Sequence, residues 1–351
     1  DVGVGNALKD VNSGVTGTTS TFNGTVNSQN VTNTGTGATT FQDNVTATNV
    51  NVNAGTSTFQ DNLTATTTTI TTGTGNFNTV SGTTTSNLQF TDNGTADLNN
   101  GLTGNVTTTA DNKGTLNLVG SNNQTVTGTV GGVGASLEKV NAGVNGSTST
   151  FNSNVYASNL NMTGTGKVIL NSDLTGNVVT TGNNKGILTT TGVNQTITGN
   201  IGSSTSLDLN TLNIGSNTDA TNYSKTTING NVFADSTVLN NNGTTNSSEL
   251  ILASGKNITS TIKTTDANMG ILTLAGGTQI VIGQVGVSGT SLKEINAGVA
   301  GSSATFANDV YATNLDVEGT GTVNLDGNFT GTAIRYNADG TVILADTKNI
   351  D

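Results

Sequence analysis

The feature that most constrains this chain is a phenylalanine that recurs at a nearly fixed interval, at Phe22, Phe41, Phe59 and Phe77. Each one opens a short run of alternating apolar and polar residues, such as FQDNVTATNVNV from Phe41. Alternation with a period of two indicates half-buried strands, and a fixed period of about 18 residues indicates a solenoid. The pattern predicts an all-β, single-stranded parallel β-helix, or β-solenoid, with coils of about 18 residues.

This arrangement also predicts what each residue type does. Coils stacked about 4.8 Å apart would place the phenylalanines above one another inside the solenoid, as a column of stacked rings. Val, Ile and Leu at alternate positions would fill the remaining core, while Thr faces outward and Asn side chains form ladders at corners.

The absence of proline supports the prediction of strands paired on both sides. An average chain of 351 residues would contain about 17 prolines, whereas this one has none. Proline cannot donate a backbone hydrogen bond, so central strands exclude it. The 47 glycines and the many asparagines supply corners instead. Only 9% of residues are charged, as expected where like charges would stack and repel.

A longer repeat overlies the short one. Related segments such as LTGNVTTTADNKGTLNLVG and LTGNVVTTGNNKGILTTTG begin near residues 102, 174, 258 and 329, so the middle spacing is longer than the other two. A higher-order repeat of about 72 residues would contain four coils of about 18 residues each. The longer spacing predicts an irregular insertion near residues 216–246. With no linker in view, we expect residues 1–351 to form one continuous β-solenoid.

The composition excludes several functions. A net charge of −11 argues against nucleic-acid partners, which need clustered Lys and Arg. No apolar run reaches the roughly 20 residues that span a bilayer, so we expect no direct membrane insertion by this chain. Since His and Cys are absent, the usual nucleophilic and zinc sites cannot form. We therefore predict no enzymatic activity, no catalytic, cofactor-binding or metal-binding residues, and no cofactor.

Four weaker signals receive structural interpretations. The pairs Lys9–Asp10, Glu138–Lys139 and Lys293–Glu294 recur, but acid and base exchange places, which a catalytic pair could not do. We interpret them as the solvated side of a short helical turn, with Leu137 and Val140 facing inward. The remaining signals are Asn337–Gly340, interpreted as a plain turn; Gly131–Gly134, interpreted as a corner; and the equivalent Tyr156 and Tyr311, interpreted as partly buried in the wall.

The repeats resemble a known family. Blocks such as KGTLNLVGSNNQTVTGTVG, SLEKVNAGVNG and STFNSNVYASNL are similar to the passenger repeats of rickettsial surface cell antigens, autotransporters of the outer membrane protein A and B type. The resemblance covers about two thirds of the chain. It implies an extracellular β-solenoid displayed on the surface of a Gram-negative bacterium, adhesive or layer-forming toward host cells.

Two main functions remain open, with a third more remote. The first is a rigid extracellular rod that presents a binding surface to a host-cell surface protein. The second is a subunit of a surface layer or filament, in which copies of the chain join end to end. The third is a polysaccharide-processing β-helix enzyme, which would need paired carboxylates and aromatic sugar platforms.

Overall fold

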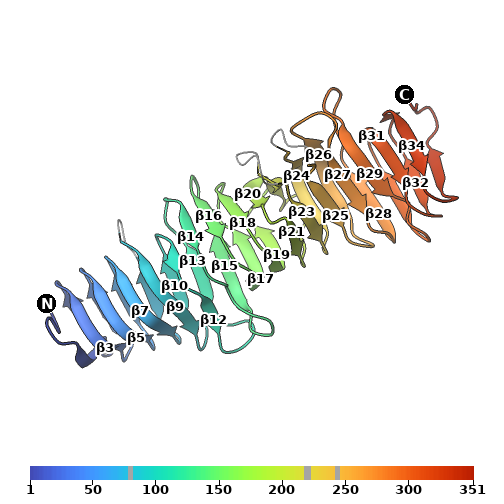
Figure 1. Ribbon diagram of the computed structural model, residues 1–351. Coiled ribbons are helices and arrows are strands. Elements are labelled where there is room, and N and C mark those ends of the chain that lie inside the picture. Colours follow the sequence, from blue (N-terminus) through green and yellow to red (C-terminus); the bar gives the residue numbers. More distant parts are fainter. Residues whose placement is uncertain (78–81, 217–222, 242–245) are drawn as a thin grey trace. The chain divides into compact units, whose positions relative to one another are not determined.

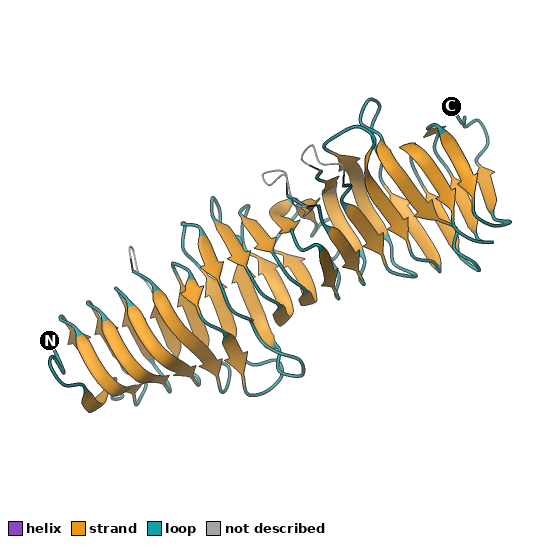
Figure 2. Ribbon diagram, in the orientation of Figure 1, coloured by secondary structure: helices purple, strands orange, loops and turns teal. Residues whose placement is uncertain are grey.

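The computed structural model describes residues 1–77, 82–216, 223–241 and 246–351. Contacts between Cα atoms divide the chain into two compact units, Asp1–Val168 (unit 1) and Ile169–Asp351 (unit 2). In both units short strands alternate with loops and turns, and the described residues contain no helix (Figure 2).

The strands of unit 1 are β1 (Leu8–Ser13), β2 (Thr19–Phe22), β3 (Val26–Asn33), β4 (Ala38–Phe41), β5 (Val45–Val52), β6 (Thr56–Phe59), β7 (Leu63–Ile70), β8 (Thr74–Phe77), β9 (Thr84–Phe90), β10 (Thr95–Leu98), β11 (Leu102–Thr103), β12 (Val106–Thr108), β13 (Thr115–Leu118), β14 (Gln124–Val126), β15 (Leu137–Ala142), β16 (Thr148–Phe151) and β17 (Val155–Met162). Strand β18 (Lys167–Leu170) contains the boundary between the units. The strands of unit 2 are β19 (Leu174–Thr180), β20 (Lys185–Thr190), β21 (Asn194–Ile197), β22 (Leu209–Ile214), β23 (Lys225–Ile228), β24 (Val232–Leu239), β25 (Glu249–Leu252), β26 (Ile258–Thr264), β27 (Met269–Leu274), β28 (Thr278–Ile282), β29 (Leu292–Ala297), β30 (Ser303–Phe306), β31 (Val310–Val317), β32 (Thr322–Leu325), β33 (Phe329–Thr330), β34 (Ala333–Tyr336) and β35 (Thr341–Leu344).

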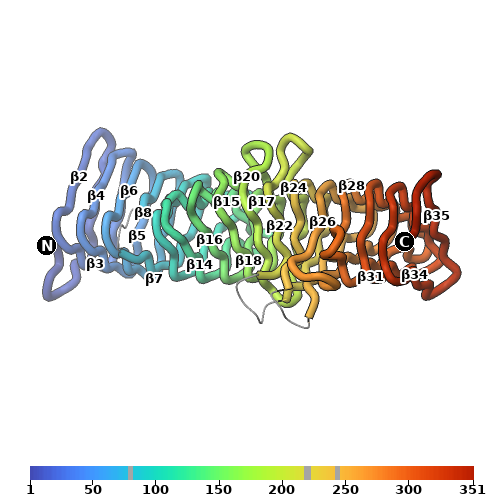
Figure 3. The backbone as a smooth tube through the Cα atoms, turned by 90° about the horizontal axis from the view of Figure 1, so that it is seen from above, coloured from blue at the N-terminus to red at the C-terminus, as the bar shows by residue number. Residues whose placement is uncertain are grey.

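Each unit is a parallel β-solenoid, which confirms the predicted fold class. In unit 1, strands β2, β4, β6 and β8 form one row, and β3, β5 and β7 form another (Figures 1 and 3). Each strand pairs in parallel with its equivalent one coil away, as β27 does with β29 in unit 2. The described residues make about 16 turns of about 20 residues each. The coil is therefore slightly longer on average than the 18 residues that the sequence period predicted.

Corners explain how one long strand serves two walls of a coil. Strand β5 alternates buried and exposed residues at both ends but has two outward residues in succession at Thr48 and Asn49. Two outward neighbours break the period of two, so the chain bends there and the next residue, Val50, points inward again. Strands β3, β7 and β24 show the same interruption. Each regular coil therefore consists of three short straight runs, which enclose the core.

The predicted phenylalanine column is present in unit 1. The ring centroids of Phe22, Phe41, Phe59 and Phe77 are separated by 5.0, 5.1 and 5.5 Å, and their planes differ by 11° or less. The last three rings are buried, and Leu98 and Leu118 continue the column above them. The coil spacing thus sets the ring spacing, because each phenylalanine pairs directly with its equivalent one coil away.

Asparagine ladders are also present, on flat walls as well as at corners. In unit 1, Asn117, Asn141 and Asn161 each donate from Nδ2 to the Oδ1 of the residue one coil below, at 2.6–2.7 Å, starting from Asp97. In unit 2 a second kind of ladder runs along a corner, where the Oδ1 atoms of Asn177, Asn200, Asn231 and Asn257 accept backbone N–H groups one coil above. The prediction of corner ladders is confirmed, and the wall ladder adds to it.

The longer repeat contains three coils, so the expectation of four equal coils is wrong. The column Ile262, Val285, Val310 and Phe329 takes one residue from each successive coil, and its three steps along the chain differ in length. Coils can grow at their corners without disturbing the ladder, since a longer surface loop costs little additional entropy. The predicted repeat starts at residues 102, 174, 258 and 329 do coincide with the first residues of β11, β19, β26 and β33.

The expected insertion near residues 216–246 corresponds to one long coil. The step from Asn194 to its ladder partner Lys225 is longer than the next step, from Lys225 to Glu249. Within the expected irregular stretch, β23 and β24 are nonetheless regular strands. Residues 217–222 and 242–245 of this prediction lie outside the described residues.

Buried glutamines close a corner in three coils. Gln124, Gln195 and Gln279 are no more than 2% exposed. Gln279 Nε2 donates to the carbonyl oxygens of Ala253 and Lys256, and its Oε1 accepts the N–H of Gly276 at 2.8 Å. This amide therefore joins its own loop to the coil below.

Truncating a phenylalanine side chain within the stack should destabilise unit 1. Phe59→Ala removes both stacking contacts and leaves a cavity, so we expect its free energy of unfolding to fall by about 3–5 kcal/mol, and by less for Phe59→Leu. Urea unfolding followed by circular dichroism would measure this. Thr46→Ala, at an exposed position, serves as control. An equal loss of stability in the control would contradict a specific contribution of the stacked rings.

Replacing the buried Gln279, which we call the glutamine clamp, by an apolar residue of similar size should destabilise unit 2. Gln279→Leu leaves the buried N–H of Gly276 without its acceptor and removes a donor to the part-buried carbonyl of Lys256, at about 1–3 kcal/mol for each unsatisfied buried group. We expect the urea midpoint to fall clearly, while the exposed neighbour change Thr278→Ala leaves it near the parent value. A Gln279→Leu variant as stable as the parent would show that the clamp contributes little.

Candidate functional site

The chain leaves the solenoid wall in three similar hairpins. Each hairpin contains an antiparallel bridge, the pairs being Gly132–Ala135 in unit 1 and Ser204–Leu207 and Val287–Thr290 in unit 2. Two of the tips point into open space, because Cβ atoms built on Gly134 and Gly289 would meet nothing within 4 Å. Val133 at the first tip is 89% exposed. These hairpins are the features most available to a partner.

A glycine and an aromatic residue fix each hairpin to the next coil. Gly131, Gly202 and Gly286 have φ values of 71°, 68° and 69°, which favour glycine. A Cβ at these positions would collide with the backbone carbonyl oxygens of Tyr156, Phe233 and Tyr311, respectively. The N–H of each aromatic residue also donates, at 2.7 Å, to the carbonyl oxygen of the residue before the glycine. The same structure thus occurs three times.

Left-handed asparagines join the foot of the hairpin to neighbouring coils. Asn268 has a φ of 58°, and its Oδ1 accepts from Ser291 at 3.0 Å and from Thr313 at 2.7 Å. In unit 1 the equivalent Asn112 accepts from Ser158, and its N–H donates to the carbonyl oxygen of Ser136 beside the hairpin at 2.9 Å. Asn184 occupies the same place in the other copy of unit 2, where its N–H donates to Asp208 Oδ1 at 2.7 Å. These bonds hold each hairpin in a defined orientation.

Two hairpins of unit 2 border hollows on the outer wall. The first, the Phe233 groove, has a volume of about 270 Å³ and is lined by Thr205, Asp208, Phe233, Ala234, Asp235, Thr259, Ser260, Thr261, Ile282, Gly283 and Asn308. The second, the Tyr311 groove, has about 310 Å³ and is lined by Asn268, Val287, Ser288, Gly289, Ser291, Tyr311, Ala312, Thr313, Thr330, Gly331, Thr332 and Asp351. Each places one half-buried aromatic residue beside hydroxyl and other polar groups.

The grooves place their carboxylates differently. Asp208 and Asp235 of the first occupy the places of Ser291 and Thr313 in the second, whose lining carboxylate is Asp351. A third hollow, in unit 1, has about 280 Å³ and is lined by threonine, serine, asparagine, alanine and glycine, without an aromatic residue. The combination of ring, hydroxyls and hairpin therefore distinguishes the grooves of unit 2 from that hollow.

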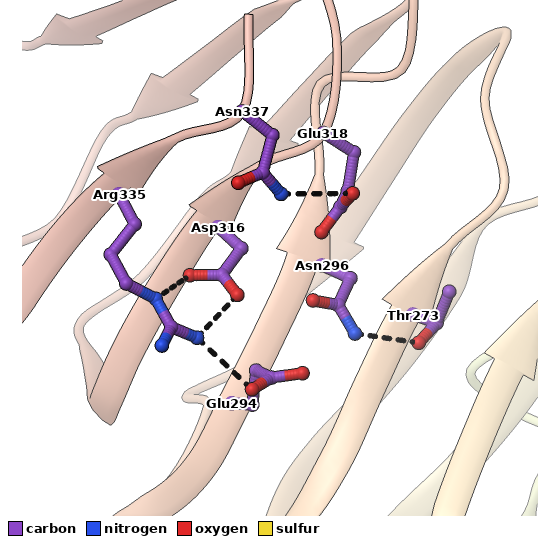
Figure 4. Close-up of polar contacts among 7 residues, drawn as sticks. All are labelled: Thr273, Glu294, Asn296, Asp316, Glu318, Arg335 and Asn337. Carbon is purple, nitrogen blue, oxygen red and sulfur yellow. Dashed lines mark hydrogen bonds and ion pairs between the residues drawn. The ribbon is translucent and has the colours of Figure 1, made fainter.

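The only arginine of the chain lies in a separate polar cluster of unit 2 (Figure 4). The guanidinium group of Arg335 contacts the carboxylate of Asp316 through Nε and Nη2, and Glu294 Oε2 lies 3.1 Å from Nη2. These carboxylates raise the pKa of Arg335. On the adjacent positions, Asn296 donates to Thr273 and Asn337 donates to Glu318. The cluster joins three coils of unit 2 in the same way as the wall ladder joins those of unit 1, so we interpret it as structural.

The prediction of a helical turn at the charged pairs is wrong. Glu138 and Lys139 lie in β15, and Lys293 and Glu294 lie in β29. Leu137 and Val140 do face inward as expected. Their spacing of three, which suggested a helix, arises because two outward residues occupy a corner of the strand.

The other interpretations have mixed outcomes. Gly131–Gly134 does not form a simple corner but belongs to the projecting hairpin, because Gly132 pairs back to Ala135. Asn337–Gly340 forms the expected turn between β34 and β35. Tyr156 and Tyr311 are partly buried in the wall, as predicted.

Sequence reasoning missed Phe233 and the two aspartates. Phe233 replaces the tyrosine of the other copies, and phenylalanine is expected in a core column. The signal that could have found it is the pair Val130–Gly131, which recurs as Ile201–Gly202 and Val285–Gly286, each followed one coil later by the aromatic residue. Within the described residues, no group of three or more carboxylates could hold a metal ion, and no helix is long and apolar enough to cross a bilayer.

The contact between Asp111 and Ser136, beside the hairpin of unit 1, should make the stability of unit 1 depend on pH. Asp111 accepts hydrogen bonds from the hydroxyl and amide of Ser136, which lower the pKa of its carboxyl. A lowered pKa in the folded state adds stability above the unfolded pKa of about 3.9, and that stability is lost as pH falls through the folded value. Between pH 7 and pH 3 the urea midpoint should therefore fall more for the parent than for Asp111→Asn. The exposed change Asp339→Asn should retain the parent's full loss.

Comparisons with known proteins add no family. No protein-family model, no curated protein and no solved structure matches this chain. The resemblance to rickettsial passengers thus depends on the motifs quoted above and stays a prediction.

Proposed function

We propose that this chain is a non-catalytic, extracellular interaction module, in which the solenoid of each unit holds its own hairpins and grooves in fixed positions for a partner on a host-cell surface. The observation that carries the proposal is the recurrence of one projecting structure in both units. The core positions and ladders account for the stability of each coil, but they do not require a hairpin that leaves the wall. The tips at Gly134 and Gly289 make little contact with the wall below them, and Thr205 at the remaining tip is exposed.

The stiffness of the scaffold supports this role. Within each unit, the coils pair with their neighbours through parallel ladders, and buried side chains fill the interior. Such repeat structures present extended surfaces with little loss of entropy on binding. Display on a Gram-negative bacterium is the part of the proposal that comes from the resemblance to autotransporter passengers.

Binding of fluorescently labelled chain to cultured epithelial cells tests the proposal. We expect saturable binding that decreases at least tenfold when all three tips are changed, by Val133→Asp, Thr205→Ala and Ser288→Asp. These positions lie outside the core, so circular dichroism should remain unchanged. A matched control changes exposed wall residues, Thr46→Ala and Thr278→Ala. Absence of saturable binding, or equal loss in the control, would contradict the proposal.

The same preparations distinguish the alternative partner, which is another copy of the chain. Electron micrographs at increasing concentrations would show separate particles if the partner lies on the host cell. Filaments or sheets, together with absent cell binding, would assign the function to self-assembly instead.

A further inference from the structure

The two grooves of unit 2 share a composition that points to one class of ligand. In the first, Phe233 pairs with Thr259 one coil up, and Thr259 pairs with Ile282. In the second, Tyr311 pairs with Thr330 in the same way. The outward side chains of these residues form a floor that is partly apolar, with hydroxyl groups beside it.

This floor suits a sugar ring better than other common ligands. A pyranose has an apolar face of C–H groups, which packs on an aromatic ring, and a rim of hydroxyls that need donors and acceptors. The volumes lie at the lower end of small-molecule pockets, roughly 300 Å³, which suits one or two sugar residues.

Other ligand classes fit the grooves less well. Phosphates, nucleic acids and acidic polysaccharides would meet Asp208 and Asp235 in a chain of net charge −11. An extended peptide would need an unpaired strand edge, whereas the strands below both grooves pair with coils on either side.

We propose that the Phe233 and Tyr311 grooves bind neutral glycans, and this inference builds on the proposed function by naming what the partner surface carries. The aromatic ring lies under the apolar face of a sugar, and hydroxyls of Thr259 or Thr330 bond to its rim. At the hairpin foot both grooves offer acceptors to sugar hydroxyls, but of different kinds. The first offers the carboxylates of Asp208 and Asp235, whereas the second offers the hydroxyl oxygens of Ser291 and Thr313, whose own hydrogens are donated to Asn268 Oδ1.

Binding of defined oligosaccharides to the full chain tests the inference. The probes are mannohexaose, cellohexaose, maltohexaose and hexa-N-acetylchitohexaose, with polygalacturonate as an acidic comparison, and isothermal titration calorimetry is the measurement. We expect at least one neutral probe to bind and polygalacturonate not to bind. The double variant Phe233→Ala/Tyr311→Ala should lose at least tenfold in affinity, because both platforms are removed. The conservative double variant Phe233→Tyr/Tyr311→Phe should remain within about threefold.

Two controls separate groove binding from general effects. Tyr336→Ala removes a 53% exposed aromatic side chain outside both grooves and should leave affinity unchanged. Asp235→Asn keeps the shape of the Phe233 groove while removing a charged acceptor, so it should weaken binding at that groove only. Binding that tolerates loss of both rings, or that Tyr336→Ala abolishes equally, would overturn the assignment.

The outcomes also separate this inference from the proposed function. If labelled chain binds cells through its tips but no neutral probe binds or competes, the glycan inference fails and the interaction module stands. If a neutral probe binds the grooves but cells are not bound, the grooves stand and the host-surface role fails.

Discussion

The rest of the structure depends on the parallel backbone ladder between successive coils. It places each residue about 4.8 Å from its equivalents above and below, so that every position becomes a column. A side chain must therefore pack against a near copy of itself. Phenylalanine rings stack, asparagine amides donate to one another and threonine hydroxyls tolerate their neighbours, whereas like charges would repel. This requirement explains the low charge, and the ladder itself explains the absence of proline.

Variation is permitted where the ladder turns corners. A coil can gain residues there because a loop that leaves and re-enters at the same corner does not change the register of the walls. The three hairpins use this freedom. The grooves follow from the same geometry, since a projecting hairpin forms one side of a hollow whose floor is the outward face of the next coils. Within a coil, the straight walls thus form the scaffold, whereas the corner that carries the hairpin contributes to the candidate site.

The sequence predicted the fold, the phenylalanine stack and most of the core because these depend on period. Alternation by two identifies inward residues, and the Phe22 to Phe77 interval identifies equivalent coils. These periods did not predict the structure correctly where the chain bends. Leu137 and Val140, three positions apart, suggested a helix, although they flank a corner within one strand. Likewise the longer repeat suggested four equal coils, yet its coils are fewer and unequal, since hairpins add length that periodicity cannot assign.

The sequence by itself determined that this chain would stack parallel coils, because proline-free alternating runs with a repeated aromatic residue have few other ways to bury their apolar side. Only the tertiary structure decided which residues meet outside the core. Phe233, Thr259 and Ile282 come from three successive coils, and Asn268 bonds to Thr313 from two coils further along the chain. Those separations reflect the length of each coil, which depends on its corners. The grooves therefore could not be predicted without knowing how many residues each corner contains.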